Sequence, residues 1–431
     1  MKLRFQLMAA MAMTAIACPA LGQESAPATF QAILEEIEAL KADQARTAAR
    51  IEALESSLNS LQGNEGPALE TPERLPQQAS LSAPAEAPAS RLDKLNVTSD
   101  LLLRYEGNFS DEDDPDRERG VMRARLGATY EVSDLVTVGA LLETGDPDDP
   151  NSGYLTMSDF ADDFEISLSR AYAAFNLGNT TIYGGKFPKP FDSMDLLWDG
   201  DVNPMGVSAV YETPLSNALS LRASGIYFIV DESAGGPDSD MIGGQIKLTA
   251  TPADGWQAWI AGAYYDYELG SVEGADAGDI RSNLIMPDGH YLSDFDILDV
   301  LTGVTWSGLS PDWPVTLRGD YVVNQGAAVD GDTAYHIDLI AGKSSAPGDL
   351  GFSLGYGQAE VDAVLAAFSN DNFGLATNYE AYKFGLDYVP VEHVRLSAAF
   401  YHYKVLDEAF AGSNLPDDWL DRLRLNLILS F

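Results

Sequence analysis

The chain has 431 residues, and its 66 acidic side chains against 26 basic ones give a formal net charge of −40. A surface that binds the phosphates of nucleic acid needs the opposite sign, so nucleic acid is excluded as a partner. Beyond the N-terminal segment, no apolar run approaches the roughly 18 residues of a membrane-spanning helix, so no such helix is predicted.

Residues 1–22 have the pattern of a secretory signal peptide. Two basic residues precede the apolar run Leu7–Ala17, and small residues mark a cleavage site that ends at Gly22. Cleavage removes two basic residues, which takes the net charge from −40 to −42, and it removes Cys18, the single cysteine. The small residues before Cys18 leave lipidation of this cysteine open as an alternative.

Residues 28–62 predict an α-helical coiled coil. The a and d heptad positions hold Phe30, Ile33, Ile37, Leu40, Gln44, Thr47, Ile51, Leu54, Leu58 and Leu61. An isolated helix cannot bury such a seam, so the segment is expected to associate with other copies of the chain. The seam alone leaves two and three strands open.

Residues 63–91 are rich in Pro, Ala, Ser, Gln and Glu and show no periodicity, so we expect a semi-extended, solvated linker.

Residues 92–431 repeat a pattern of strand, short turn, strand and long acidic loop. Arg123 and Arg125 alternate with the apolar residues Met122, Ala124 and Leu126, which places charge and apolar surface on opposite faces. Short turns on one side and long loops on the other are typical of an outer-membrane barrel. The fold class is therefore predicted as an all-β transmembrane barrel of about 16 antiparallel strands after the coiled coil. A secreted, acidic, soluble all-β protein is the alternative.

The last strand alternates in the same way and ends on an aromatic residue. Leu423, Leu425, Leu427, Leu429 and Phe431 share one parity, opposite to Arg422 and Arg424. This segment resembles the end of outer-membrane β-barrels, in which a C-terminal aromatic is the assembly signal. The resemblance implies the Gram-negative outer membrane as location, its lipid and lipopolysaccharide as surroundings, and the barrel-assembly machinery as a partner of Phe431.

Aromatic residues near strand ends are expected to form girdles at the membrane interfaces. The candidates are Trp256, Trp259, Tyr264, Tyr265, Tyr401 and Tyr403.

A barrel of this width holds water, so something must narrow it. The third long loop, Asp192–Gly206, mixes Leu, Met and Trp with four aspartates. We predict that it folds into the lumen, that its apolar residues pack against the wall, and that Asp195, Asp199 and Asp201 face the water. The predicted constriction residues are Asp192, Asp195, Trp198, Asp199 and Asp201.

Inward parity predicts a set of basic wall residues opposite that loop. They are Arg104, Arg123, Arg125, Arg170, Lys186, Arg222, Arg318, Arg395, Arg422 and Arg424. Acids facing bases across a pore create a transverse field that orients dipolar solutes. Alternatively, these bases pair with inward acids such as Asp100 and hold the barrel's shape. The wall favours anions and the loop favours cations; the net charge inclines us to cations.

Four stretches carry a resemblance to the Gram-negative "putative porin" family: Asp100–Glu106, Arg123–Gly127, Gly185–Phe191 and Leu196–Asp201. Membership implies passive passage of small hydrophilic solutes. It also implies a periplasmic coiled coil and, as in many porin-like barrels, a homotrimer. Two alternatives remain: a substrate-specific channel, which could be anion-selective, and an envelope tether or adhesin that reaches toward peptidoglycan.

Neither catalysis nor a cofactor is expected. His290, His336, His393 and His402 show no metal-ligand spacing. The run from Asp199 to Asn203 has calcium-like oxygen spacing, and other acidic loops leave weak Ca²⁺ binding open, but a solvated loop tip is the interpretation we favour.

Overall fold

The computed structural model describes residues 91–110, 117–147, 149–158, 164–271, 282–308, 310, 313–411 and 418–431. The predicted signal peptide, coiled coil and nearly all of the predicted linker lie outside these residues, so those assignments stay predictions. Within the described ranges, no helix is long and apolar enough to cross a membrane.

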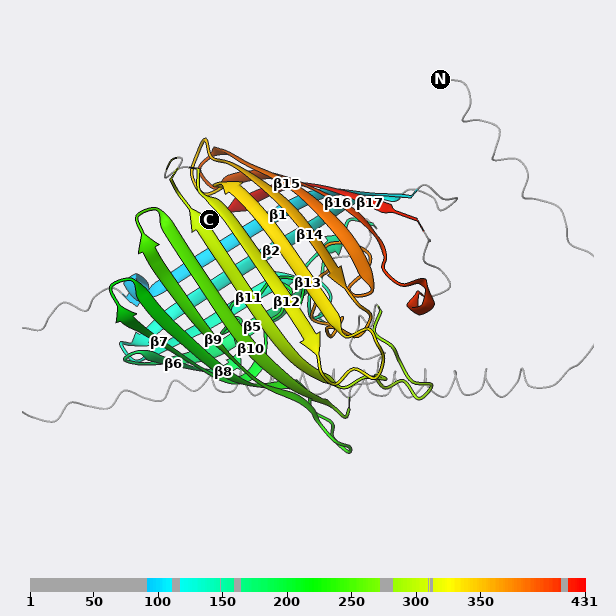
Figure 1. Ribbon diagram of the computed structural model, residues 1–431. Helices are drawn as coiled ribbons and strands as arrows, with labels where there is room; N and C mark the ends of the chain where they lie inside the picture. The colour runs from blue at the N-terminus through cyan, green and yellow to red at the C-terminus, as the bar shows by residue number, and fades with distance from the viewer. Residues whose placement is uncertain are drawn as a thin grey trace, which may run out of the picture. The chain divides into compact units, whose positions relative to one another are not determined.

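The described residues form strands almost throughout (Figure 1). The strands are β1 (Leu95–Ser110), β2 (Arg117–Ser133), β3 (Val136–Thr144), β4 (Leu155–Thr156), β5 (Ile166–Leu177), β6 (Thr180–Lys186), β7 (Met205–Ser216), β8 (Leu219–Asp231), β9 (Ser239–Ala253), β10 (Trp256–Leu269), β11 (Phe295–Trp306), β12 (Val315–Asn324), β13 (Thr333–Gly342), β14 (Leu350–Ala359), β15 (Tyr379–Val391), β16 (Val394–Val405) and β17 (Leu420–Ser430). Two 3₁₀ turns, η1 (Arg91–Lys94) and η2 (Glu408–Phe410), complete the elements.

Sixteen of these strands close into a ring of antiparallel pairs. Each pairs with its neighbours in the chain, β3 pairs with β5, and β17 returns to β1. In Figure 1 the blue first strand accordingly lies beside the red last one. The short β4 stands apart from the ring order and pairs only with β2. The predicted 16-stranded barrel is confirmed, and its closure gives every strand of the ring two partners, as lipid requires.

Side chains alternate between lipid and lumen as the sequence predicts. On β2, Leu126 is 50% exposed on the outside while Arg123 is 8% exposed inside. On β17, Leu425 is 45% exposed and Arg424 is 4% exposed. An apolar outer face and a charged inner face follow from the two-residue period of the strand.

The predicted aromatic girdle needs correction for four of its six residues. Trp256 and Tyr264 on β10 are exposed on the outside. Tyr265 is fully buried inside, as are Tyr401 and Tyr403 on β16, and Trp259 packs on an interior cluster that contains Met194. Neighbouring residues of a strand point to opposite faces, so Tyr264 and Tyr265 cannot share one belt.

Candidate functional site

The connection at residues 187–204, between β6 and β7, begins and ends at a pair of glycines. Gly185 and Gly206 are paired across the two strands, and both have a positive φ (114° and 146°). A Cβ on either residue would collide with a backbone oxygen of the next strand, that of Ala171 or Tyr227. Only glycine fits at these two positions, and their backbone geometry ends the β6–β7 hydrogen-bond ladder where the loop begins.

The loop at 187–204 packs through apolar side chains. Trp198 is fully buried, and its ring stacks on Phe368 with the centroids 5.5 Å apart and the planes at 5°. The edges of Phe191 and Tyr265 approach the same indole at 5.3 and 5.7 Å. These rings belong to one cluster with inward-facing residues of β8–β11, such as Phe295. Burial of this many rings anchors the loop on the residues of these strands.

A second loop, residues 360–378 between β14 and β15, meets the first one. The backbone N–H of Asp199 donates to the carbonyl oxygen of Phe368 at 2.8 Å. The Asn372 amide donates to Asp195 Oδ2 at 3.1 Å. The side chain of Asn283, from the loop before β11, donates to the backbone oxygen of Val364 at 2.9 Å. The interior is thus crossed by several connected loops rather than by one.

Two of the predicted constriction acids are paired with wall bases. Asp192 accepts hydrogen bonds from Arg222 at 3.0 Å and from Lys247 at 2.8 Å. Asp201 lies 3.1 Å from Arg123 and 3.2 Å from Arg125. Loop acids and wall bases therefore meet as ion pairs.

Asp199 does not face the water, contrary to the prediction. Its side chain is buried at 6% exposure and accepts the backbone N–H of Asp201 at 2.8 Å. Burial, with Asp371, Asp195 and Asp201 nearby, raises the pKa of this carboxyl well above its usual range. The remaining aspartate of the loop, Asp195, is more exposed than Asp199 and accepts a hydrogen bond from Asn372 of the second loop.

Lys189 stabilises the backbone of the loop at Trp198 and Asp199. Its Nζ donates to the carbonyl oxygen of Trp198 at 2.8 Å and to that of Asp199 at 2.5 Å. Burial lowers the pKa of this ammonium.

Three of the predicted wall arginines, together with Arg119, surround one glutamate on β1. Glu106 is fully buried, and its carboxylate lies 2.6 Å from Arg119 and 2.8 Å from Arg424. Arg104 and Arg422 approach it at 3.9 and 4.0 Å. Arg119 was not among the predicted residues. The group carries an excess of positive charge, since one carboxylate serves four guanidinium groups.

The remaining wall bases are distributed around the ring. Arg170 donates to Asn203 at 2.5 Å, and Arg318 pairs with Asp338 at 2.7 Å. Lys186 is exposed at the end of β6, and Arg395 is half-buried on β16. The prediction of a single basic wall opposite the loop therefore holds only for the strands around β1.

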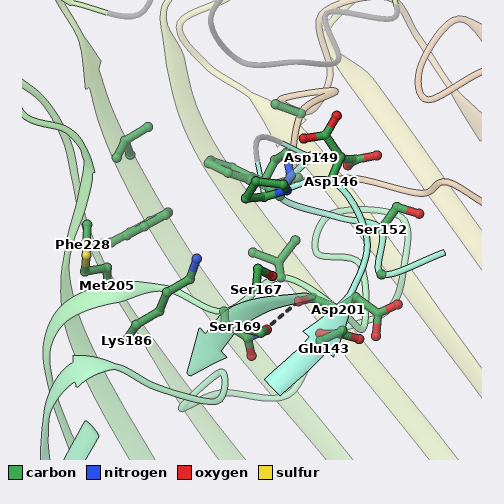
Figure 2. Close-up of a pocket in the computed structure, with 18 of the residues that line it drawn as sticks. Glu143, Asp146, Asp149, Ser152, Ser167, Ser169, Lys186, Asp201, Met205 and Phe228 are labelled. Carbon is green, nitrogen blue, oxygen red and sulfur yellow. Dashed lines mark hydrogen bonds between the residues drawn. The ribbon is translucent and has the colours of Figure 1, made fainter. Parts of the chain in front are cut away.

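Two cavities of opposite lining charge adjoin inside the barrel. One, of about 350 Å³, is lined by Arg104, Arg119, Arg422 and Arg424, with Tyr154 and two aspartates. The other, of about 480 Å³, is lined by Glu143, Asp146, Asp149, Asp201 and Asp231, with Lys186 as the one base among the described residues that line it (Figure 2). Asp149 and Ser152 line both. Figure 2 shows Lys186 extending toward the middle, with Glu143 and Asp201 together on the other side.

The calcium-like run from Asp199 to Asn203 does not form a metal site. Asp199 is committed to a backbone N–H, Asp201 to two arginines, and Asn203 to Arg170 and Ser169. In the described part of the chain, no group of three or more His, Cys, Asp or Glu side chains is placed to hold a metal. The acidic run Asp111–Asp116 lies outside it.

Sequence reasoning missed the loop at 360–378 and Tyr154. The apolar run Ala363–Phe368 in an acidic loop gives the same signal as Leu196–Trp198 and could have revealed the loop. Tyr154 gives no such signal: its ring lies under the guanidinium of Arg104 at 4.1 Å, a contact made by tertiary structure.

The C-terminal Phe431 is 70% exposed, and its backbone N–H donates to Ser99 at 2.8 Å, which fastens the end of the chain to the first strand. Its role as an assembly signal remains a prediction.

Comparisons with known proteins agree with this architecture. Residues 109–281 match the model of a family described as "Putative porin". Pseudomonas putida OprB, in its high-pH structure, is similar with 13% identity over 79% of this chain and 95% of that one, at a TM-score of 0.53. An OmpT variant of Vibrio cholerae without loop L8 (12% identity, 79% and 100% covered, TM-score 0.48) and an anion-selective porin from Comamonas acidovorans (12%, 78% and 99%, 0.47) are more distant. No curated protein matches the chain in sequence.

At these identities the solved structures show the fold alone. The family match over residues 109–281 and the closed barrel together confirm the predicted resemblance to the Gram-negative putative porin family.

Proposed function

We propose that this porin lets small hydrophilic solutes and ions diffuse passively through its barrel, down their gradients and without a cofactor. The observation that carries the proposal is the closed wall of 16 strands with an apolar outside and an inside lined by arginine and acid side chains. Such a wall is stable in lipid and keeps its bore wet.

The constriction belongs to the same proposal. The loop at 187–204, with Asp192, Asp195, Trp198, Asp199 and Asp201, narrows the bore from one side, and the loop at 360–378 braces it. The support is the stacking of Trp198 on Phe368 and the backbone hydrogen bond between the two loops. Ions then pass between charged groups that attract them locally, so the energy barrier to their passage stays small.

Conductance of the purified protein in planar lipid bilayers tests this function. We expect ohmic single-channel steps that grow in proportion to KCl concentration. A protein that inserts but gives no steps would contradict the proposal. The reversal potential in a KCl gradient measures the ion preference, for which the net charge of −40 favours cations.

An anion-specific channel is the second candidate, and the cavity lined by four arginines favours it. A carboxylate or phosphate there would receive charge-assisted hydrogen bonds from planar guanidinium groups. Under this function the KCl current would be blocked, with saturation, by a dicarboxylate such as succinate but not by a neutral diol of the same length.

We further propose that the chain assembles as a homotrimer through the coiled coil at 28–62, held in the periplasm. The unbroken heptad seam supports self-association, and the resemblance to porin-like barrels, which commonly form trimers, favours three strands over two. Ile37→Asp together with Ile51→Asp should reduce the cross-linked trimer; an unchanged trimer would move the contact to the barrel.

A further inference from the structure

The larger cavity has two unlike sides. Glu143, Asp146 and Asp149 belong to β3 and the loop that follows it, while Phe228, Val230, Leu269, Leu365 and Phe368 provide apolar surface. One further acid, Asp231, ends β8 next to Val230. Figure 2 shows Phe228 and Met205 across the cavity from Glu143 and Asp201. A site meant for hydrated metal ions has no use for such a surface, because apolar groups cannot replace lost water ligands.

Glu143 is the most constrained of these acids. Its side chain is about nine-tenths buried or more, at 6% exposure, and among the described residues its Oε1 has no hydrogen-bond partner. The nearest base, Arg125, is 3.8 Å away and is already bonded to Asp100 at 2.7 Å and to Asp201 at 3.2 Å. A buried carboxylate oxygen without a donor gains free energy from any cation that brings one.

We propose that this cavity binds organic cations: solutes with an ammonium group on a short apolar body. The ammonium lies on the side of Glu143 and Asp201, and the body lies against Phe228 and Val230. The inference rests on the proposed function, since such solutes would enter through the bore, and it adds their chemical class.

Lys186 should have the opposite effect to Glu143 on the affinity for an ammonium group, and this allows a second test. Among the residues that the structure describes, it is the one base that lines the cavity, and Figure 2 shows its side chain reaching toward the same space. It repels the ammonium that Glu143 attracts, so the two residues should shift the affinity in opposite directions.

Titration calorimetry of the detergent-solubilised full chain with n-butylammonium chloride measures the binding directly. We expect saturable binding that exceeds that of n-butanol. Lengthening from ethyl- to hexylammonium should raise the affinity, by at most about fourfold for each methylene that is fully buried. Equal binding of n-butanol and butylammonium would overturn the proposal.

Glu143→Gln should lower the butylammonium affinity about tenfold, since a charge-assisted hydrogen bond is lost. Lys186→Gln should raise it severalfold. Glu392→Gln, in the exposed turn between β15 and β16, is the matched control and should change nothing. If Glu143→Gln fails to fold, the Lys186 variant still decides: an affinity that does not rise would contradict the inference.

Calorimetry separates this inference from the porin proposal. Binding by a barrel that does not conduct would support the cation site and contradict the channel. Ohmic conductance without butylammonium binding would contradict the cation site alone.

Discussion

The lumen has two kinds of wall. Around β1, β2 and β17 the inward residues are arginines and acids in ion pairs, with Glu106 at their centre. Around β8–β11 they are rings and aliphatic chains such as Phe228, Tyr265 and Phe295, and the loop at 187–204 packs on them. The same strand period produces both walls, so only the inward residue type differs.

Under the proposed function, this difference would narrow the wide barrel on one side only. Exposing an apolar inner wall to water costs free energy, so this wall is covered by a loop that carries aromatic rings of its own. A charged inner wall is stable against water and stays available to solutes. The apolar side therefore anchors the loop at 187–204, and the charged side provides the electric field that acts on solutes.

Removing the main anchor should have the largest effect. Trp198→Ala deletes a fully buried ring from the loop cluster and should cost the loop about 3–5 kcal/mol. The loop should then leave the wall, so single-channel conductance should rise and protease should cut within residues 187–204. Trp256→Ala, on the outer face at 44% exposure, is the control. Unchanged conductance would show that this loop does not limit the bore.

Glu106→Gln tests the charged wall. Four arginines would lose their shared carboxylate, which should destabilise the barrel by about 3 kcal/mol in urea unfolding from lipid vesicles. The reversal potential should move toward anions. Glu380→Gln, which breaks the single pair with Lys404 at 3.3 Å, should do neither to a comparable extent.

The glycine pair tests the loop's departure point. Gly206→Ala places a methyl group against the Tyr227 carbonyl at a positive φ and should cost about 1–3 kcal/mol. Gly200→Ala, within the same loop, meets no atom within 4 Å and should be tolerated. Equal melting temperatures of both variants would contradict the strain assigned to Gly206.

The smallest effect concerns pH. The pKa of Asp199 is raised by burial in the folded loop, so the stability it contributes is complete below the ordinary pKa of aspartate and is lost as pH rises through the raised value. Loop anchoring should therefore weaken as the pH rises from about 4, the ordinary pKa of aspartate, and this should appear as growing current noise. Asp199→Asn should remove this dependence. Any pH dependence that remains in this variant comes from the neighbouring groups, which are Asp195, Asp201, Asp371 and Lys189.

Much of this could be predicted from the chain alone, because a strand repeats every two residues. The parity of Arg123 against Leu126, and of Arg424 against Leu425, gave the faces of the wall and hence the barrel. Likewise, Leu196–Trp198 in an acidic loop indicated a packed loop. The girdle prediction failed where this rule was not applied, at Tyr264 and Tyr265.

Contacts between distant strands could not be predicted in the same way. Glu106 gathers arginines from β1, β2 and β17 because the ring closes in one register, with Glu106 opposite Arg119 and Arg424. No local pattern encodes that register. The burial of Asp199 also depends on a second loop, at 360–378, folding over it.

The pairing of β17 with β1 also has a kinetic consequence. Ser99 exchanges backbone hydrogen bonds with Phe431, which continues the seam between β1 and β17, the two ring strands that lie furthest apart in the sequence. Until these two strands have paired, each presents an unpaired edge that lipid cannot tolerate and that invites aggregation. Contacts this distant in sequence form slowly, so closure of this seam should be a late step of folding.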